Sequence, residues 1–426
     1  MSKSIIKKGI LVFFSVIVGL SLLGCDRHTQ ARGAFIPSHS NSLMQNLSAS
    51  SIDTVALDNT FINAKINLSF DLFYQMIETN KNTMISGTSI LLALSLLANG
   101  ADGNTLDQIE QVIGMPIASL NRFLYSFIDG LHSCEKSQLE IANAVWFRRN
   151  GINVSQDFLE RALDYFNATA YASNFNQDTI NDINNWVAHY TDGMIPHIIN
   201  DLDPLSVMAL FNAIMFDAEW AVGYEAEDIL QNRIFVNQGG QEQRVTMMQS
   251  IEQGFLIDGD YATGFRKNYY GRHYSFVALL PNEGICVIEY AKGMSGTRFL
   301  SILNNGQHYM TKAHLPKFEF SNNFGIIGAL KNLGINDLFC EQEANLTRIG
   351  TPVSGNLFVN EGIHSTFIEV NEKGTRAAAA TGFFIGCSDG RGGWYQREVI
   401  LNRPFMFAII DNNTNLPIFK GTVLNI

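Results

Sequence analysis

Side chains able to do acid–base or nucleophilic chemistry are scattered singly through this 426-residue chain. The sequence has no G-x-S-x-G, P-loop, H-E-x-x-H or EF-hand motif, so the common spacings for nucleophilic, phosphate and metal chemistry are missing. Among the nine histidines, His364 stands between apolar residues in "GIHSTF", which is more typical of a buried sheet histidine than of a general base. Glu225, Glu227 and Asp228 form one acidic run, which we expect on a solvated face. No motif therefore indicates an enzyme, a metal site or a cofactor.

The five cysteines also lack a chemical pattern, because none forms a C-x-x-C pair or stands at a zinc-ligand interval from histidine pairs. Cys25 ends the apolar N-terminal run, and the other four are spread over the chain. Their even number permits disulfides in an exported protein without establishing them. The disulfide state therefore stays open for Cys134, Cys286, Cys340 and Cys387.

The most unusual stretch is "EVNEKGTRAAAATGFFIG", residues 369–386, in which four alanines follow a glycine-containing turn. Four alanines are too few for a stable isolated helix, which needs about 12 to 15 residues. Counted by twos, one face of a strand would be uncharged and Arg376 would lie on the other face. The uncharged face would carry Thr375, Ala377, Ala379, Thr381, Phe383 and Ile385. This alternation predicts a strand that buries one face, with Gly374 as its pivot. A helix or a flexible loop is the alternative.

The N-terminus is expected to be an export signal, residues 1–24, rather than part of the fold. Basic residues precede an apolar run at positions 10–23, which is short for a bilayer span of about 20 helical residues. A permanent membrane helix is the alternative. The run ends in "LLGC", which resembles the bacterial lipobox and predicts lipidation of Cys25, with a plain signal peptide as the alternative. We therefore expect an exported protein, lipid-anchored at the cell envelope on its periplasmic face or at the cell surface.

Behind the signal, the sequence divides into a polar segment and one long domain. Residues 25–60 are rich in Ser, Asn and Gln and have no sustained apolar period, so we expect a flexible tether. Residues 61–426 contain no long linker and no internal repeat, which predicts a single domain. The composition is globular, with 46% apolar residues and a formal net charge of −11. Without a basic block, nucleic acid is not expected as a partner.

Helical patterns occupy the first third of this domain, and strand patterns dominate the rest. The segment "TSILLALSLLANG" is apolar on nearly every side, which predicts a buried helix, and Thr105 with Gln108 matches a capping box. Strand patterns occur in "VMALFNAIMF", "YSFVALLP", "HSTFIEV" and "FMFAIID". One late helix, "NFGIIGALKNLG", is expected to end at Gly334 as a C-cap. Helices first and strands later indicate an α+β fold.

Several segments of this domain resemble, in family order, the characteristic segments of the serpins. The segment "SGTSILLALSLLANGADGNTLDQI" is similar to the family's Ser-Pro-x-Ser-Ile helix, and "NAVWFRRNGINVSQDFLERALDYFNA" to its Asn-Ala-x-Trp strand and following helix. Later matches are "LFNAIMFDAEW", "LPKFEF", "IHSTFIEVNEKGTRAAAATG" and "LNRPFMFAIIDNNTNLPIFKG". Residues 61–426 thus resemble a serpin over the whole length of that fold.

This resemblance implies three β-sheets, about nine helices and an exposed reactive-centre loop. A target protease attacks the loop as a substrate, and the cut loop then inserts as a strand into the largest sheet and traps the acyl-enzyme. We thus expect an inhibitor of serine proteases, with cysteine proteases as further targets, that is a monomer and needs no cofactor. A non-inhibitory serpin that acts as a binding or structural protein is the alternative.

By the same resemblance, three groups of residues serve loop insertion. The hinge, from which the loop moves, comprises Glu372, Gly374, Thr375, Ala377, Ala378, Ala379 and Ala380. The shutter, a polar cluster beneath the opening point of the sheet, comprises Ser86, Ser89, Asn212 and His364. The breach, at the top of the opening, is marked by Trp220. Static packing is the alternative role for the shutter and the breach. The chain departs from the family pattern at Gly87, in "DAEW" before the tryptophan, and at Ser365.

The cleaved bond stays open between two positions. The usual family register puts it fourteen residues after Gly374, between Ser388 and Asp389, which suits an elastase-like protease. The loop is longer than is typical, so the bond between Arg391 and Gly392 is the alternative and would indicate trypsin-like targets.

Overall fold

The computed structural model describes residues 33–375 and 396–426. Several predictions lie outside the described residues. They concern the signal segment with Cys25 and the thiol of Cys387. They also concern part of the hinge (Ala377, Ala378, Ala379 and Ala380) and both alternative reactive bonds (Ser388–Asp389 and Arg391–Gly392).

Nine α-helices occur in the described residues, and the first six all precede the strand-rich part of the chain. This order confirms the α+β prediction. The early helices are α1 (Asn59–Met76), α2 (Gly87–Gly100), α3 (Gly103–Ile113), α4 (Ile117–Asp129), α5 (Gln156–Phe166) and α6 (Gln177–Tyr190). The later ones are α7 (Val287–Lys292), α8 (Gly296–Asn304) and α9 (Ile327–Leu333), which ends as predicted at Gly334 in a left-handed C-cap conformation.

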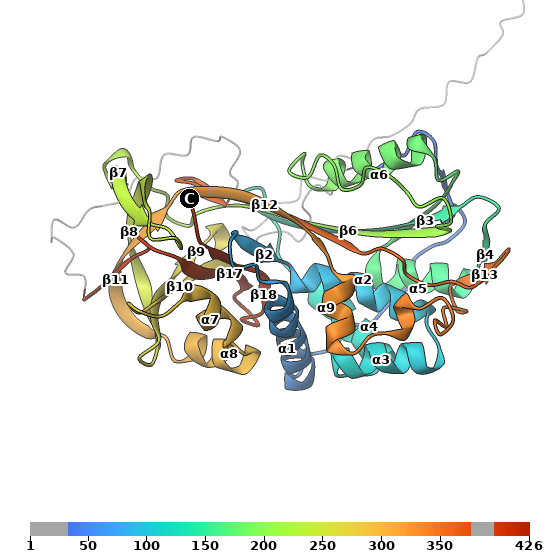
Figure 1. Cartoon of the computed structure of the whole chain (residues 1–426), viewed down its shortest axis with the longest axis horizontal. Helices are drawn as coiled ribbons and strands as arrows, with labels where there is room; N and C mark the ends of the chain where they lie inside the picture. Colours follow the sequence, from blue (N-terminus) through green and yellow to red (C-terminus); the bar gives the residue numbers. More distant parts are fainter. Residues whose placement is uncertain (1–32, 376–395) are drawn as a thin grey trace, which may run out of the picture.

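The central sheet has seven strands in the order β1-β5-β3-β6-β15-β14-β12. Figure 1 shows this sheet between α6 on one face and a layer formed by α2 to α5 and α9 on the other. Its strands are β1 (Asn41–Ser42), β5 (Thr169–Ser173), β3 (Ser137–Arg148), β6 (Met208–Glu219), β15 (Gly374–Thr375), β14 (Ile363–Val370) and β12 (Phe318–Gly325).

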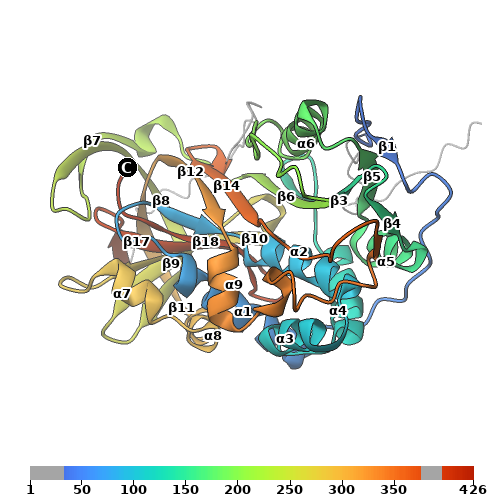
Figure 2. The same cartoon turned by 45° about the vertical axis from the view of Figure 1, so that its right-hand side comes forward.

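A second sheet of nine strands forms the other end of the molecule, with α7 and α8 packed against it (Figure 2). Its order is β16-β11-β8-β9-β10-β17-β18-β2, and β7 pairs with β8. The strands are β16 (Arg397–Ile400), β11 (Gln307–Pro316), β8 (Glu242–Asp258), β9 (Ala262–Asn268), β10 (Tyr274–Pro281), β17 (Phe405–Asp411), β18 (Pro417–Val423), β2 (Thr83–Ile85) and β7 (Ile229–Val236).

A third sheet pairs β13 (Gly350–Pro352) with β4 (Ile152–Val154), and three short 3₁₀ helices are η1 (Ala226–Asp228), η2 (Tyr270–Arg272) and η3 (Asp337–Phe339). Three sheets and nine helices are the architecture that the serpin resemblance implies.

The buried helix predicted from the apolar early segment is α2. Only Ala93 and Leu97 of this helix are not fully buried, because α2 contacts α1, α4, α5 and the central sheet. Its N-terminus is capped by Ser86, whose Oγ accepts a hydrogen bond from the backbone N–H of Ser89.

The capping box predicted from Thr105 and Gln108 is wrong. Helix α3 begins earlier, with Asp102 as its N-cap, so that Thr105 lies inside the helix. Thr105 Oγ1 instead accepts from the backbone N–H of Asn345 at 2.9 Å, and Gln108 Nε2 donates to Asp337 at 2.7 Å. These side chains tie α3 to a loop more than 200 positions away in the sequence, which a local pattern cannot reveal.

Residues 33–58, which we expected in a flexible tether, lie along the domain instead. Strand β1 adds an edge strand to β5, as Figure 2 shows. The buried carboxylate of Asp182 on α6 accepts three hydrogen bonds, from the backbone N–H groups of Ser38 and His39 and from the hydroxyl of Ser40, at 2.7 to 3.1 Å. The polar segment is therefore ordered by specific partners rather than by apolar content, which the composition does not reveal.

An Asp182→Ala variant should detach this segment, since it leaves three donors without their acceptor. We expect the free energy of unfolding to fall by about 2 to 3 kcal/mol, measured by urea unfolding. Asn181→Ala, which changes an exposed neighbour on the same helix, is the control. Equal stability of the two variants would contradict the anchoring role of Asp182.

Candidate functional site

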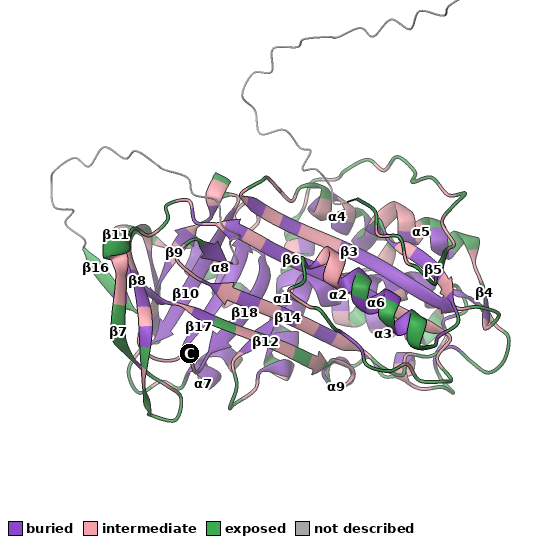
Figure 3. Ribbon diagram, turned by 90° about the horizontal axis from the view of Figure 1, so that it is seen from above, coloured by how far each residue is buried: buried purple, intermediate pink, exposed green. Residues whose placement is uncertain are grey.

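Strand β15 is a two-residue strand placed between β6 and β14. Gly374 pairs with Glu219 of β6, and Thr375 pairs with both Ala218 of β6 and Val370 of β14. Within the described ranges, these two residues are the only ones that join β6 to β14 in the sheet. The central sheet, seen from above in Figure 3, thus consists of two groups of strands that meet at the hinge.

No side chain fits at Gly374. A Cβ atom built at this position would lie 1.9 Å from the carbonyl oxygen of Ala218. We predicted a pivot with an unusual backbone angle at Gly374. The φ angle of Gly374 lies outside the left-handed region, so the glycine is not needed for such an angle. It is needed because the hinge approaches the backbone of β6 so closely.

Thr375 enters a buried aromatic environment. Its side chain is only 3% exposed, and its hydroxyl shares a short hydrogen bond with the hydroxyl of Tyr269. The ring of Tyr269 stacks on Trp220, with 4.6 Å between centroids and 12° between planes. Burial raises the pKa of Tyr269, so the phenol remains protonated and can donate. Tyr269 was not predicted, because the "YY" pair that precedes the strand pattern "YSFVALLP" matches no motif.

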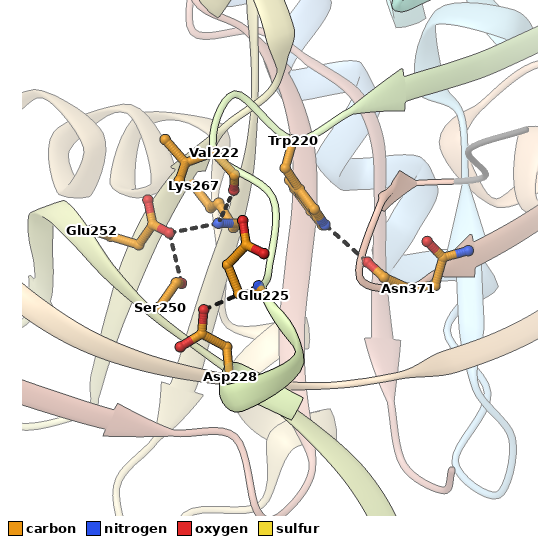
Figure 4. A network of polar contacts seen from close by, with 8 residues as sticks. All are labelled: Trp220, Val222, Glu225, Asp228, Ser250, Glu252, Lys267 and Asn371. Atoms are coloured by element: carbon orange, nitrogen blue, oxygen red, sulfur yellow. Dashed lines mark hydrogen bonds and ion pairs between the residues drawn. The ribbon is translucent and has the colours of Figure 1, made fainter. Parts of the chain in front are cut away.

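Trp220, the predicted breach residue, holds the turn that leads into the hinge (Figure 4). Its indole Nε1 donates to the carbonyl oxygen of Asn371 at 2.9 Å, and its backbone N–H donates to that of Lys373 at 2.8 Å. Both carbonyls belong to the turn between β14 and β15. The predicted breach tryptophan is therefore hydrogen-bonded to the turn that leads into the hinge.

Glu372, a predicted hinge residue in the same turn, forms an ion pair with Lys317 between β11 and β12. The hydrogen bond from Lys317 lowers the pKa of the Glu372 carboxyl below its ordinary value. Because the two side chains are 32% and 39% exposed, solvent screening limits the stabilisation by this pair.

The four predicted shutter residues lie in one chain of hydrogen bonds. The backbone N–H of Ser86 donates to His364 Nε2 at 3.0 Å, and the backbone N–H of Ser89 donates to Ser86 Oγ at 3.1 Å. The Ser89 hydroxyl donates to Asn212 Oδ1, and Asn212 Nδ2 donates to Asn143 Oδ1 at 2.8 Å. The chain links β14, α2, β6 and β3. Asn143 was missed, although it is the asparagine of the quoted "NAVWF" segment.

His364, the histidine of this chain of hydrogen bonds, has a strongly lowered pKa. Burial lowers its pKa to about 4, so the imidazole is neutral at pH 7 and its Nε2 accepts from Ser86. This environment is that of a satisfied sheet histidine.

A cavity of about 390 Å³ lies where the first residues of β6 and of β14, at the end of these strands away from the hinge, meet α2 and α9. The shutter residues Ser89, Asn212 and His364 line its upper end. Apolar side chains line most of the remainder, including Ile90, Leu97, Leu210, Leu330 and Leu338. The sheet therefore has unfilled volume beneath the position where the two groups of strands separate.

Two departures from the family pattern have local explanations. A Cβ atom at Gly87 would lie 2.2 Å from Ser69 Oγ, which accepts a hydrogen bond from the buried Lys420. Glu219, in "DAEW", forms an ion pair with Lys136 at 3.1 Å.

Cys134, Cys286 and Cys340 have free thiols. Among the residues that the structure covers, no three His, Cys, Asp or Glu side chains come together as metal ligands, and no helix has the length and apolarity needed to cross a bilayer.

The stability of the protein should fall as the pH decreases from 6.5 toward 4 because of His364. In this window the unfolded state, with an ordinary histidine pKa of 6.5, binds a proton that the native state with a pKa of about 4 does not bind. The loss should reach about 3 kcal/mol, measured by urea unfolding at several pH values. The slope should decrease in His364→Gln but not in His308→Gln, which changes an exposed histidine. An unchanged slope in His364→Gln would contradict this assignment.

The sequence model of one family, described as serpin (serine protease inhibitor), matches residues 63–426. An uncharacterised serpin-like protein of Thermococcus kodakarensis is 28% identical over 373 residues, with 85% of each chain covered. Human neuroserpin is 26% identical over 396 residues, which cover 88% of this chain and 94% of the relative.

The fold is also similar to solved structures of tengpin, a thermophilic serpin. Its native state gives a TM-score of 0.86 at 40% identity, covering 91% of this chain and 100% of tengpin. Its latent state gives a TM-score of 0.79 at 39% identity, covering 88% and 100%. The family match spans the described fold from α1 to β18. The chain therefore belongs to the serpin family.

Proposed function

We propose that this serpin inhibits serine proteases, with cysteine proteases as further targets, as a suicide substrate whose cut loop inserts between β6 and β14. One observation carries the proposal: Gly374 and Thr375 already form the first two residues of a strand between β6 and β14. The residues after Thr375 would extend this strand toward the start of β6. The protein would act as a monomer without a cofactor.

The chemistry requires only a cleavable bond in this serpin. The nucleophile of the protease attacks the carbonyl carbon before that bond, the amine side leaves with a proton, and an ester or thioester acyl-enzyme remains. Loop insertion then competes with hydrolysis of this acyl bond. If insertion is faster, the protease is carried along the sheet and its active site is distorted.

The free energy for insertion has a source in the cavity beneath the sheet. Ladder hydrogen bonds at ~0.5 to 1.5 kcal/mol each are nearly offset by backbone ordering at ~1 to 2 kcal/mol per residue. Burial of large apolar side chains of the loop in the pocket beneath the sheet would add ~1.5 to 3 kcal/mol each. Phe383 and Ile385, which lie on the uncharged parity of the loop sequence, are the large apolar side chains available for this.

The proposed mechanism needs a native state in which the loop has not inserted, and the similarity to native tengpin, higher than that to latent tengpin, supports it. Native tengpin gives the higher TM-score, 0.86 against 0.79 for the latent state. An inhibitor must hold the loop outside the sheet before it meets a protease.

We further propose that the protein is exported and lipid-anchored at the cell envelope, with signal residues 1–24 and lipidation at Cys25. The basic start, the short apolar run and the lipobox-like "LLGC" support this placement. The inhibitory domain would then meet proteases outside the cytoplasm.

Incubation of the domain with an elastase or trypsin should give SDS-resistant complexes, and Thr375→Arg should convert the inhibitor into a substrate. The arginine would place a charge in a site that is 3% exposed, so the stoichiometry of inhibition should rise more than about tenfold. Ser321→Arg, on the exposed side of β12, is the control and should inhibit normally. Unaffected inhibition by Thr375→Arg, or cleavage without complexes across a protease panel, would contradict the mechanism.

Mass spectrometry of the C-terminal fragment should locate the reactive bond. With elastase we expect a fragment beginning at Asp389, which places Ser388 before the cut. If trypsin forms a fragment beginning at Gly392 and is inhibited faster than elastase, the reactive bond is the one after Arg391. Inhibition with cleavage at neither bond would show that the family register does not apply.

A further inference from the structure

A buried lysine lies directly beneath the breach, outside every motif of the sequence. Lys267 on β9 is 1% exposed, and its Nζ forms an ion pair with Glu252 Oε1 of β8 at 2.8 Å. The same Glu252 oxygen accepts from the hydroxyl of Ser250 at 2.7 Å (Figure 4). A charge at this depth is tolerated only when it is paired and hydrogen-bonded.

The remaining contacts of Lys267 go to the segment that follows β6, residues 220–224, which we name the cap segment. The Nζ atom donates to the carbonyl oxygen of Val222 at 3.1 Å. It also lies 4.4 Å from the ring centroid of Tyr224 and 5.3 Å from that of Trp220, at cation–π distances. Because the side chain of Val222 is 71% exposed, it does not anchor the cap segment to the core. The start of the cap segment is held by Trp220, which is 3% exposed and stacks on Tyr269, and by the backbone N–H of Ala221, which donates to the carbonyl of Asn268 at 3.0 Å. Lys267 anchors the part that follows, from Val222 to Tyr224.

The cap segment in turn holds every carbonyl of the turn before the hinge. Trp220 donates to the carbonyls of Asn371 and Lys373, and the backbone N–H of Tyr224 donates to that of Glu372 at 3.5 Å. In Figure 4 the cap segment passes between the Lys267 side chain and this turn. A continuous set of contacts thus leads from a charge buried between β8 and β9 to the residues that precede Gly374.

We propose that Lys267 is a positioning residue for loop insertion: by anchoring the cap segment, it fixes the hinge turn so that the cut loop enters between β6 and β14. The proposal rests on the proposed inhibitory function. With the turn fixed, Gly374 and Thr375 stay paired, and insertion only extends an existing strand. With the cap segment loose, this starting geometry is populated less often, insertion slows, and more acyl-enzyme is hydrolysed.

The ion pair alone does not require this role, because a buried ion pair can be replaced by apolar residues with little loss of stability. The contact that an apolar replacement cannot reproduce is the one with the Val222 carbonyl. A Lys267→Met/Glu252→Met double variant removes both charges together and leaves neither one unpaired. Arg298→Met/Asp258→Asn, which removes a pair of 2.7 Å between α8 and β8 away from the hinge, is the matched control.

Amide hydrogen exchange tests the anchor without any protease. In the Lys267→Met/Glu252→Met variant, exchange at Trp220 and Tyr224 should become about tenfold faster, as expected for the loss of one charged hydrogen bond. The β9–β10 ladder should keep its protection, and the control variant should exchange normally at both amides. If the double variant does not fold, Tyr224→Leu leaves the ion pair intact and should give a smaller increase at Trp220. Unchanged exchange at these amides would overturn the proposal.

The stoichiometry of inhibition tests the consequence. It should rise at least about threefold in the double variant, because insertion and hydrolysis compete for one acyl-enzyme, while the control variant keeps the wild-type value. Faster exchange with wild-type stoichiometry would overturn the positioning role. If the wild-type protein forms no complex with any protease, the proposed function fails, and the exchange measurement still decides whether Lys267 anchors the cap segment.

Discussion

The structure depends on one constraint: β6 and β14 must hold Gly374 and Thr375 between them, while no described residue joins the two strands below that point. The approach of β6 is so close that a Cβ atom at position 374 would collide with Ala218. The hydroxyl of Thr375 meets that of Tyr269 in a site closed by Trp220. Gly374 and Thr375 thus already pair in register with β6 and β14, so a longer strand at this place would keep the same pairing.

The polar groups around this point differ in burial, and this difference decides what each can do. The pair of Lys317 and Glu372 is partly exposed, so it contributes little to stability and can separate easily. Lys267 is buried with its partner and holds the cap segment in place. The shutter residues are joined by hydrogen bonds in which the imidazole of His364 is neutral. The charged contacts of this region thus lie around the hinge turn, whereas the shutter is held by neutral groups.

The proximity of the four shutter residues, and the place of Gly374 and Thr375 between β6 and β14, agree with segments whose order along the chain is characteristic. The roles of these residues in loop insertion stay predictions. The all-round apolar pattern likewise predicted the burial of α2. Contacts of residues that stand in no characteristic segment could not be anticipated: Tyr269 is 106 positions from Thr375, and Lys267 lies in a strand without a motif. The capping box failed because Thr105 and Gln108 bond to a distant loop. The tether prediction likewise did not consider that a polar segment can be ordered by a single carboxylate, that of Asp182.

The most direct test of the account is a crystal structure of the protein after a protease has cut it within residues 376–395. If the loop inserts as proposed, the residues following Thr375 will form a strand between β6 and β14, and Thr375 will keep its pairing with Ala218. Side chains of the inserted strand will fill the cavity lined by Asn212 and His364. A cut protein in which β6 and β14 keep their present spacing and this cavity remains unfilled would contradict it.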